Sequence, residues 1–297
     1  MTDRRFRFVL VGLAANGLVP QRLEAVLAER RDLQARSDHR HVMALGTAIA
    51  ALSDLDAETT PVAVGGDGTL SLMVQALHTL GRLDRPIGVL PFGTGNAFAY
   101  SQGLLPAARA VNALHSSSVR ELDLMLTSHP DAPVAVTSLS TGVEARFIHG
   151  FARLRRWTRP VGVALAFGGA LGAGRTRVSL QLDGETVLAS GDWCIGAGLY
   201  NTRVYAFGHE VFPEADPADG LAEGVVFTTR RAYVRGLIRG ISSGASRSGL
   251  IFRRWREARI ETTGLLQIDG EIVGPSALNV TVARGALQIL VPSFVSG

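Results

Sequence analysis

A glycine-rich turn between a strand and a helix constrains the fold of this chain more than any other feature. The apolar run Pro61–Val64 leads into the turn, and an apolar helical pattern starts at Leu70 directly after it. The turn itself consists of Gly65, Gly66, Asp67, Gly68 and Thr69. Glycines let backbone N–H groups approach phosphate oxygens closely, and the start of a helix adds a partial positive charge. The turn therefore predicts a phosphate site.

The acidic residue in the middle of this turn is its most informative member. Asp67 repels a phosphate unless a metal ion or a proton lies between them, and a carboxylate is a preferred ligand of Mg²⁺. The alternative interpretation is that Asp67 only caps the helix that follows.

A second glycine turn follows a second short strand. The strand-like run Ile87–Pro91 leads into Phe92 and then into Gly93, Thr94, Gly95 and Asn96. In an open parallel sheet, the loops at the carboxyl ends of adjacent strands converge on one crevice, where ligands bind. The alternative is a tight strand-to-helix connection in which Asn96 tolerates an unusual backbone angle.

The two turns together resemble the catalytic domain of diacylglycerol kinases, sphingosine kinases and related bacterial lipid kinases. The stretch from Pro213 to Leu221 resembles the metal-site loop of that family, and Asp269-Gly270-Glu271 resembles its late acidic motif. Four motifs in the same order extend the resemblance over nearly the whole chain. The first turn alone also occurs in NAD kinases and phosphofructokinases.

The resemblance implies a lipid kinase that uses ATP and Mg²⁺ to phosphorylate a hydroxyl of a diacylglycerol-like or sphingoid lipid. Glu271 would be the general base, Asp67 would bind Mg²⁺, and both glycine turns would hold the nucleotide. Ser37 stands roughly where relatives place a nucleotide contact. The further metal ligands implied by the resemblance are Asp123, Asp216, Asp219 and Leu221. Two other functions stay open: an NAD kinase-type phosphotransferase, and a non-catalytic relative that binds lipid or nucleotide.

Several implied roles have a structural alternative. Asp-Gly commonly forms a hairpin turn, and the chain holds a second copy of the acidic motif at Asp183-Gly184-Glu185. The later copy is the better candidate because it follows the strand-like run Leu265–Ile268 at the family position. Asp123 has a linker carboxylate as an alternative that is nearly as good.

The sequence also departs from the family pattern. Relatives begin with a strand followed by Asn-Pro and a phosphate-contacting loop, whereas this chain has Val11–Gly17, which puts the grip of that loop on the nucleotide in doubt. Ala97 stands where an aspartate is common in relatives.

The pattern of apolar residues predicts two domains. Residues 1–123 alternate between strand and helix, with a strand at Phe6–Gly12 and helices at Pro20–Arg36 and His41–Leu52, which is typical of a doubly wound parallel α/β domain. Residues 124–297 read as short strands with Asp-Gly turns and predict a mostly antiparallel β domain, whose last residues return to the first domain.

Composition excludes some chemistry. All 30 basic residues counted as Lys and Arg are arginines, so a P-loop lysine and a Schiff-base lysine are both excluded. The single Cys194 excludes an internal disulfide and suits a reducing cytoplasm. The N-terminus predicts no export signal. The longest apolar stretch, Val161–Gly174, is shorter than the roughly 20 residues that cross a bilayer.

Positive charge is concentrated in the second part of the chain. Residues 230–259 contain nine arginines and one acidic residue, and a second basic cluster surrounds Trp157: Arg153, Arg155, Arg156 and Arg159. These clusters predict contact with an anionic membrane surface, with Trp157 and Trp255 at interfacial depth. We expect a cytoplasmic protein that is peripheral at the inner membrane face. No nucleic-acid motif is present, and the sequence leaves a homodimer open.

Overall fold

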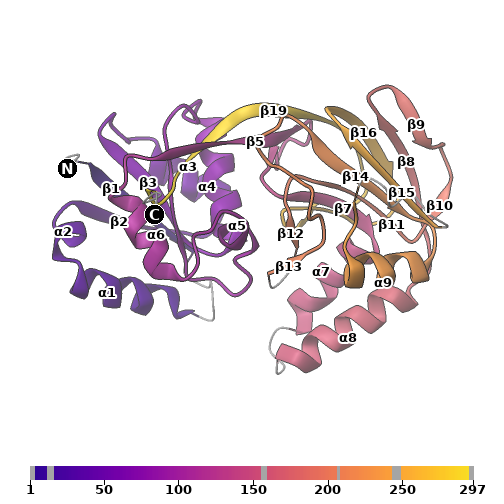
Figure 1. The fold of residues 1–297 in the computed structure, drawn as a ribbon, viewed down its shortest axis with the longest axis horizontal. Helices are drawn as coiled ribbons and strands as arrows, with labels where there is room; N and C mark the ends of the chain where they lie inside the picture. The colour runs from indigo at the N-terminus through magenta and orange to yellow at the C-terminus, as the bar shows by residue number, and fades with distance from the viewer. Residues whose placement is uncertain (1–3, 12–16, 155–158, 206–207, 243–248, 294–297) are drawn as a thin grey trace. The chain divides into compact units, whose positions relative to one another are not determined.

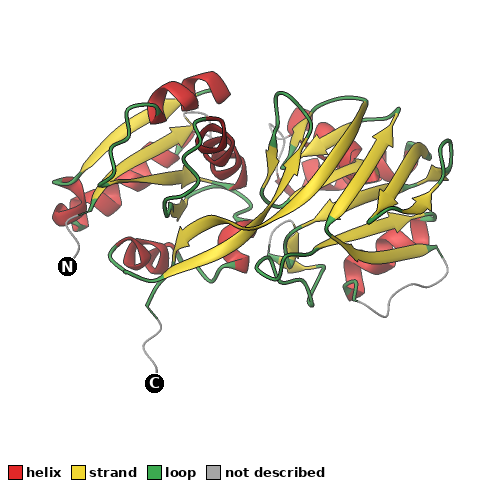
Figure 2. Ribbon diagram, turned by 90° about the horizontal axis from the view of Figure 1, so that it is seen from above, coloured by secondary structure: helices red, strands yellow, loops and turns green. Residues whose placement is uncertain are grey.

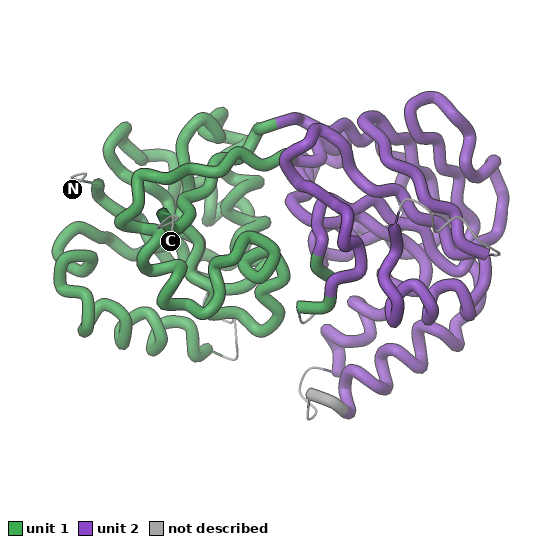
Figure 3. The backbone as a smooth tube through the Cα atoms, viewed as in Figure 1, with its two compact units in different colours: residues 1–123, 204–209, 285–297 green, residues 124–203, 210–284 purple. Residues whose placement is uncertain are grey.

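The computed structural model describes residues 4–11, 17–154, 159–205, 208–242 and 249–293. The chain forms two compact units (Figure 3). Unit 1 contains residues 1–123, 204–209 and 285–297, and unit 2 contains residues 124–203 and 210–284. The strands β5 (Val119–Thr127) and β19 (Ser276–Leu290) each contribute residues to both units. Figure 2 shows β19 as the long strand that leads to the C-terminus. The return of residues 204–209 to unit 1 had no counterpart in the sequence prediction.

Unit 1 is built on a parallel sheet of four strands in the order β2-β1-β3-β4. The strands are β1 (Arg5–Val11), β2 (Ser37–Val42), β3 (Thr59–Gly65) and β4 (Gly88–Pro91). The helices are α1 (Val19–Glu29), α2 (Arg31–Gln34), α3 (Leu45–Leu52), α4 (Asp67–Thr79), α5 (Ala97–Ser101) and α6 (Ala107–Leu114). Figure 1 shows α3 and α4 on one side of the sheet and α1 and α6 on the other. The predicted α/β fold of the first domain is confirmed.

The segment before α3 differs from the prediction. We expected one helix over 20–36 and another over 41–52, but the first breaks at Arg30 (φ −122°, ψ 71°) and the second begins only at Leu45. Residues 37–42 between them form the edge strand β2. Most of the β2 side chains are polar, so the strand has no apolar pattern by which the sequence alone reveals it.

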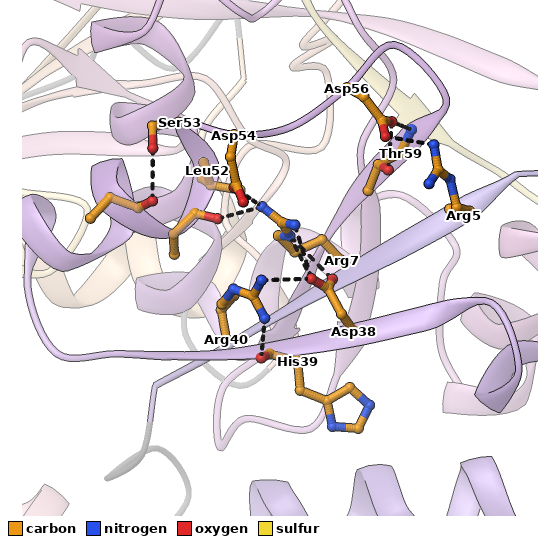
Figure 4. A network of polar contacts seen from close by, with 12 residues as sticks. Arg5, Arg7, Asp38, His39, Arg40, Leu52, Ser53, Asp54, Asp56 and Thr59 are labelled. Carbon is orange, nitrogen blue, oxygen red and sulfur yellow. Dashed lines mark hydrogen bonds and ion pairs between the residues drawn. The ribbon is translucent and has the colours of Figure 1, made fainter.

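A buried arginine holds this polar strand in place (Figure 4). Arg7 on β1 is 8% exposed, and its Nε donates to both carboxylate oxygens of Asp38 on β2 at 3.1 and 3.0 Å. The same guanidinium donates to the Ala51 carbonyl at 3.0 Å and to Asp54. The charge of Arg7 is therefore compensated by groups from β2 and from the end of α3, which explains how an arginine is tolerated inside the sheet.

Unit 2 contains two sheets with antiparallel pairing. Their orders are β10-β8-β16-β19-β5-β6, with β9 paired to β8, and β15-β14-β11-β7-β17-β18. The strands of the first sheet are β6 (Val134–Ala135), β8 (Thr176–Leu182), β9 (Glu185–Leu188), β10 (Trp193–Cys194) and β16 (Glu257–Thr262). Those of the second are β7 (Ser138–Gly142), β11 (Gly196–Tyr200), β14 (Ala222–Phe227), β15 (Leu250–Trp255), β17 (Leu266–Ile268) and β18 (Glu271–Ile272). The predicted antiparallel β domain is confirmed.

The core of unit 2 lies between these sheets. It joins Leu180 and Ile260 of the first sheet to Leu199 and Trp255 of the second. Trp255 is 0% exposed, so the prediction that it sits at membrane depth is wrong. Trp157 lies outside the described residues.

Three helices complete unit 2: α7 (Val143–Leu154), α8 (Arg159–Gly172) and α9 (Arg230–Arg239). The helix α7 contacts β7, α9 contacts β14, and α8 packs on α7. A small two-stranded sheet, β12 (Val204–Tyr205) and β13 (His209–Glu210), lies at the segment that returns to unit 1. No helix within the described ranges has both the length and the apolar character to cross a membrane.

Candidate active site

The first glycine turn connects β3 to α4. Every residue of β3 is buried, and the strand ends at Gly65. A Cβ on Gly65 would lie 2.9 Å from the Cβ of Thr69, so only glycine leaves room for the Thr69 side chain to fold back against the strand end. Thr69 is 4% exposed. The turn is therefore packed closely, with the backbone of Gly66 and the start of α4 at the carboxyl edge of the sheet.

The second glycine turn touches the first. The N–H of Gly93 donates to the carbonyl of Gly65 at 2.9 Å. A Cβ on Gly93 would lie 2.5 Å from the backbone nitrogen of Gly66 and 2.8 Å from Asn96 Oδ1, and one on Gly95 would lie 3.2 Å from Asp67 Oδ2. The absence of side chains at these positions lets the backbones meet. The structure thus brings the two predicted turns together, and they line a small cavity with Leu70, Val89 and Phe98.

Asp67 joins the two turns through its carboxylate. The N–H of Ala97 donates to Asp67 Oδ2 at 3.1 Å, and the N–H of Phe98 donates to Oδ1 at 2.9 Å. Asp67 itself belongs to the first turn of α4, but these bonds satisfy the amino end of α5. The carboxylate therefore caps a helix, although it is the helix after the second turn and not the one after the first.

Asn96 has the unusual backbone that the sequence suggested, with φ 53° and ψ 37°. Its Nδ2 donates to the carbonyls of Pro91 and Gly93, both at 3.1 Å. Its Oδ1 is buried and has no hydrogen-bond partner among the described residues. A carboxylate and an amide oxygen are ligands that Mg²⁺ prefers, and the side-chain-free turns beside them leave backbone N–H groups open to phosphate oxygens. The residues around Asp67 therefore fit a magnesium–nucleotide group.

Arg22 is a residue near these turns that the sequence analysis missed. It lies on α1, and its Nη1 donates to the carbonyl of Phe92 at 2.8 Å. A guanidinium beside the second turn adds positive charge where a phosphate would be held. No local signal distinguishes Arg22 from the other arginines of a surface helix.

Ser37, Asp123 and the segment 12–16 are the other parts of unit 1 that the sequence analysis considered for the nucleotide and metal site. Ser37 begins β2 and lies opposite Phe6, at the amino edge of the parallel sheet, whereas Gly65 ends β3 at the carboxyl edge. We therefore leave Ser37 out of the proposed site. Asp123 is buried, and its Oδ1 accepts the N–H of Gly285 on β19 at 2.8 Å. In the segment Val11–Gly17, which departs from the family's phosphate-contacting loop, residues 12–16 lie outside the described residues.

Both copies of the acidic motif form the same kind of hairpin turn. Asp269 and Gly270 have φ values of 47° and 93° between β17 and β18, and Asp183 and Gly184 have 48° and 81° between β8 and β9. Glu271, the first residue of β18, is exposed and belongs to unit 2.

The two hairpins differ in how their aspartates are anchored. The Asp269 carboxylate accepts the backbone N–H groups of Val136, Thr137 and Ser138 at 2.7 to 3.0 Å. The Asp183 carboxylate accepts those of Arg256 and Glu257. The turn before Glu271 is also tied to a buried glutamine, because the Gly270 N–H donates to Gln267 Oε1 at 2.7 Å.

The loop from Pro213 to Leu221, predicted as a second metal site, contacts an arginine side chain. Asp219 pairs with the guanidinium of Arg254, and its Oδ1 accepts the N–H of Leu221 at 2.9 Å. Asp216 Oδ1 accepts the N–H of Ala218 at 3.2 Å. No group of three or more acidic, histidine or cysteine side chains suited to a metal occurs in the part of the chain that the structure describes. Arg254 therefore occupies one side of Asp219 in this structure. The metal site implied by the resemblance, which would combine the Asp219 carboxylate with backbone oxygens near Asp216 and Leu221, stays a prediction.

A buried acid near the Glu271 hairpin has a strongly shifted pKa. Glu144 lies in the first turn of α7, and burial raises its pKa to about 7, although hydrogen bonds from Tyr200 and Ser140 oppose the shift. Ser140 also accepts a hydrogen bond from Gln267 Nε2 at 2.8 Å. A polar chain inside unit 2 therefore runs from Glu144 through Ser140 and Gln267 to the turn at Gly270.

This shift predicts a pH-dependent stability. Because the folded state holds the Glu144 proton up to about pH 7 and the unfolded state releases it near pH 4.5, stability falls as the pH rises between these values. The expected loss is roughly 3 kcal/mol. Glu144→Gln should remove this loss. In urea titrations, the free energy of unfolding of the variant should exceed that of the wild type at pH 8 but not at pH 5. Burial also raises the pKa of Glu223 to about 8, so the free energy of unfolding of the variant will still fall somewhat as the pH rises. Glu185→Gln, which changes an exposed acid, is the control. If the free energy of unfolding of Glu144→Gln depends on pH as in the wild type, Glu144 is not the source of the pH dependence.

Comparison with known proteins agrees with this two-unit architecture. Residues 12–127 match the diacylglycerol kinase catalytic domain, and residues 137–291 match the YegS C-terminal NAD kinase beta sandwich-like domain. An α/β unit with paired glycine turns and a β-sandwich unit thus define a kinase of the diacylglycerol kinase catalytic-domain class. More narrowly, the chain belongs to the YegS-like lipid kinase family.

Relatives and solved structures support this placement. A protein from Pseudomonas aeruginosa (strain UCBPP-PA14) described as "Probable lipid kinase YegS-like" is 28% identical over 244 residues, covering 79% of this chain and 77% of the relative. One from Alcanivorax borkumensis with the same description is 26% identical over 249 residues, covering 78% and 79%. A crystal structure of a diacylglycerol kinase from Bacillus anthracis str. Sterne has the same fold, with a TM-score of 0.70, 14% identity and 98% of each chain covered. An NAD kinase from Archaeoglobus fulgidus, solved in complex with ATP, has a TM-score of 0.50, 15% identity and coverage of 97% and 94%.

Proposed function

We propose that this protein transfers the γ-phosphoryl group of ATP, with Mg²⁺, to a hydroxyl of a diacylglycerol-like or sphingoid lipid at a membrane surface. The observation that carries the proposal is the contact between the two glycine turns, where the Gly93 N–H meets the Gly65 carbonyl at 2.9 Å beside the Asp67 carboxylate. Such a turn pair at the carboxyl edge of a parallel sheet offers backbone N–H groups to phosphates.

Each residue of the turns has a distinct proposed task. Gly65, Gly66 and Gly68 keep side chains away from the phosphates, and Thr69 offers its hydroxyl. In the second turn, Gly93, Thr94, Gly95 and Asn96 complete the nucleotide cradle. Asp67 would hold Mg²⁺ while its hydrogen bonds to α5 keep the turns together. Bound Mg²⁺ supplies charge neutralisation for the transferred phosphoryl group.

The acceptor hydroxyl needs a group that takes its proton. We assign this task to Glu271, an exposed carboxylate whose hairpin is anchored by Asp269 and Gln267. Asp123 remains a proposed contributor to the metal network; its burial and its bond to Gly285 also serve the fold.

A transfer assay tests the proposal directly. Purified protein, ATP labelled at the γ-phosphate and Mg²⁺ are incubated with detergent micelles that contain diacylglycerol or sphingosine, and separately with NAD. We expect label in a lipid product. Label in NADP would favour the NAD kinase-type reaction, which the fold similarity to the Archaeoglobus fulgidus enzyme makes worth testing. Nucleotide binding without transfer to any acceptor would favour a non-catalytic relative.

The two copies of the acidic motif provide a matched pair of variants. Glu271→Gln should lower kcat for the lipid by about 10²-fold, because a general base contributes on the order of 10² to 10⁴ in rate. Glu185→Gln changes another exposed glutamate after the same type of turn and should leave kcat unchanged. Steady-state kinetics in detergent micelles measures both. The base assignment fails if the two variants have equal rates.

A further inference from the structure

The helix α8 has an unusual composition for a helix at the surface. From Val161 to Gly172 it contains no side chain that is charged or polar. Its buried positions are Gly162, Ala166 and Ala170, spaced by four residues, so that one stripe of the helix is covered. This stripe faces α7, since a Cβ on Gly162 would lie 3.0 Å from the Leu154 carbonyl oxygen. The small residues let the two helices approach closely.

The opposite face of α8 is exposed and equally apolar. Leu165 is 53% exposed and Val161 is 44% exposed. Other exposed residues on the helix are Ala164, Gly168, Gly169 and Gly172. A surface helix of a globular protein normally carries polar residues on its outer face, so this face is built to contact an apolar environment.

The chain around α8 carries only positive charge. No acidic residue occurs over Ala145–Leu182, which includes α8, or over Gly224–Arg256, which includes α9. The two helices are in contact, because Arg230 Nε donates to the Leu171 carbonyl at 2.6 Å and the Phe167 ring stacks with that of Tyr233 at 6.2 Å. Figure 1 shows α7, α8 and α9 grouped in unit 2.

Exposed arginines border the apolar face. The helix α9 presents Arg231, Arg235 and Arg239 to solvent together with Ile238, which is 71% exposed. Arg153 at the end of α7 and Arg175 after α8 are exposed as well. An apolar surface edged by arginines complements the acyl region and the anionic headgroups of a bilayer.

We propose that α8 lies in the plane of an anionic lipid membrane, with its Val161–Leu165 face inserted at the acyl boundary and the arginines of α9 at the headgroups. This inference rests on the proposed lipid kinase function and names the part of the molecule that meets the lipid phase. At about 1.5 Å per residue, the 14 residues of α8 span about 21 Å, which suits an in-plane helix and not a bilayer span of roughly 30 Å. A second copy of the chain is a poorer occupant, because it would place arginines against arginines.

Vesicle co-sedimentation tests the proposal. Full-length protein is mixed with one of two kinds of vesicle: pure phosphatidylcholine, or phosphatidylcholine and phosphatidylglycerol in equal amounts. We expect binding to the anionic vesicles, a more than tenfold loss in Leu165→Asp, and a roughly fivefold loss in Arg235→Gln. Val161→Asp is a second apolar variant in case the first alters folding, which circular dichroism checks. Met43→Asp, at a 64% exposed residue of unit 1, and Arg259→Gln, on the exposed side of β16, are matched controls that should bind like the wild type.

Two further measurements separate the possible outcomes. Phosphoryl transfer to lipid in detergent micelles should be nearly equal in the wild type and Leu165→Asp, because micelles deliver the lipid without docking. A failure of wild-type transfer would then concern the proposed function and not the surface. Equal vesicle binding by Leu165→Asp and the wild type would overturn the docking proposal. So would a wild-type dimer in gel filtration that Leu165→Asp converts to a monomer, with no vesicle binding by either.

Discussion

Replacing Asp67 by asparagine should lower kcat for lipid phosphorylation on the order of 10³-fold, because the variant loses the negative charge proposed to hold Mg²⁺ at the phosphates. The carboxylate also accepts the N–H groups of Ala97 and Phe98. Asparagine has only one acceptor oxygen, so one of these capping bonds is lost at a cost of about 1 kcal/mol in stability. Steady-state kinetics over a range of Mg²⁺ concentrations measures the first effect, and urea unfolding measures the second.

The two effects distinguish a catalytic from a purely structural Asp67. If the residue acts only as a cap of α5, Asp67→Asn will be slightly less stable and its rate per folded molecule will be close to that of the wild type. If it binds the metal, the rate will fall far more than the stability, and the Mg²⁺ concentration needed for half-maximal rate will rise. A variant with unchanged kcat and unchanged Mg²⁺ dependence would remove Asp67 from the site.

Replacing Gly93 by alanine should destabilise unit 1 by about 3 kcal/mol, the upper end for overpacking, because the obstructing atoms belong to the backbone. The added Cβ would lie 2.2 Å from the Cα and 2.5 Å from the nitrogen of Gly66. These backbone atoms cannot rotate away, so the two turns must separate and break the bond between Gly93 and Gly65. We therefore also expect nucleotide binding to be lost.

Hydrogen exchange combined with urea titration reports this change within unit 1. The amides of β4 and α5 should exchange faster in Gly93→Ala, while those of the unit 2 sheets keep their protection. Gly68→Ala is the matched control, since a Cβ at that position meets no atom within 4 Å and the residue lies inside α4. This control should be as stable as the wild type or about 0.5 to 1 kcal/mol more stable. Equal exchange in both variants would show that the contact between the turns contributes nothing.

The glycine turns were predictable because their signal is local. A buried strand, a run of small residues and a helix pattern stand next to one another in the chain, and parallel connection places both turns at one edge of the sheet. The contact between Gly65 and Gly93 follows from that rule together with the lack of side chains.

Other features gave no such signal or a misleading one. The polar strand β2 was expected to be a loop followed by a helix, because its pairing depends on β1 and on the distant Arg7. Trp255 and its arginine neighbours read as an interfacial surface, yet strand alternation turns the tryptophan into the core of unit 2. The two Asp-Gly-Glu motifs form the same kind of turn, and they differ in the segments that bind their aspartates and in the bond from the Gly270 N–H to Gln267.

The sequence by itself determined the two-domain plan, the paired turns and the absence of lysine chemistry, since each of these is encoded in composition or in residues that are neighbours along the chain. Only the tertiary structure decided that Asp67 caps α5, that Arg254 stands against Asp219 and that one face of α8 is left uncovered. These outcomes depend on which side chains meet across elements far apart in the sequence, and such meetings are set by packing, which no local pattern records.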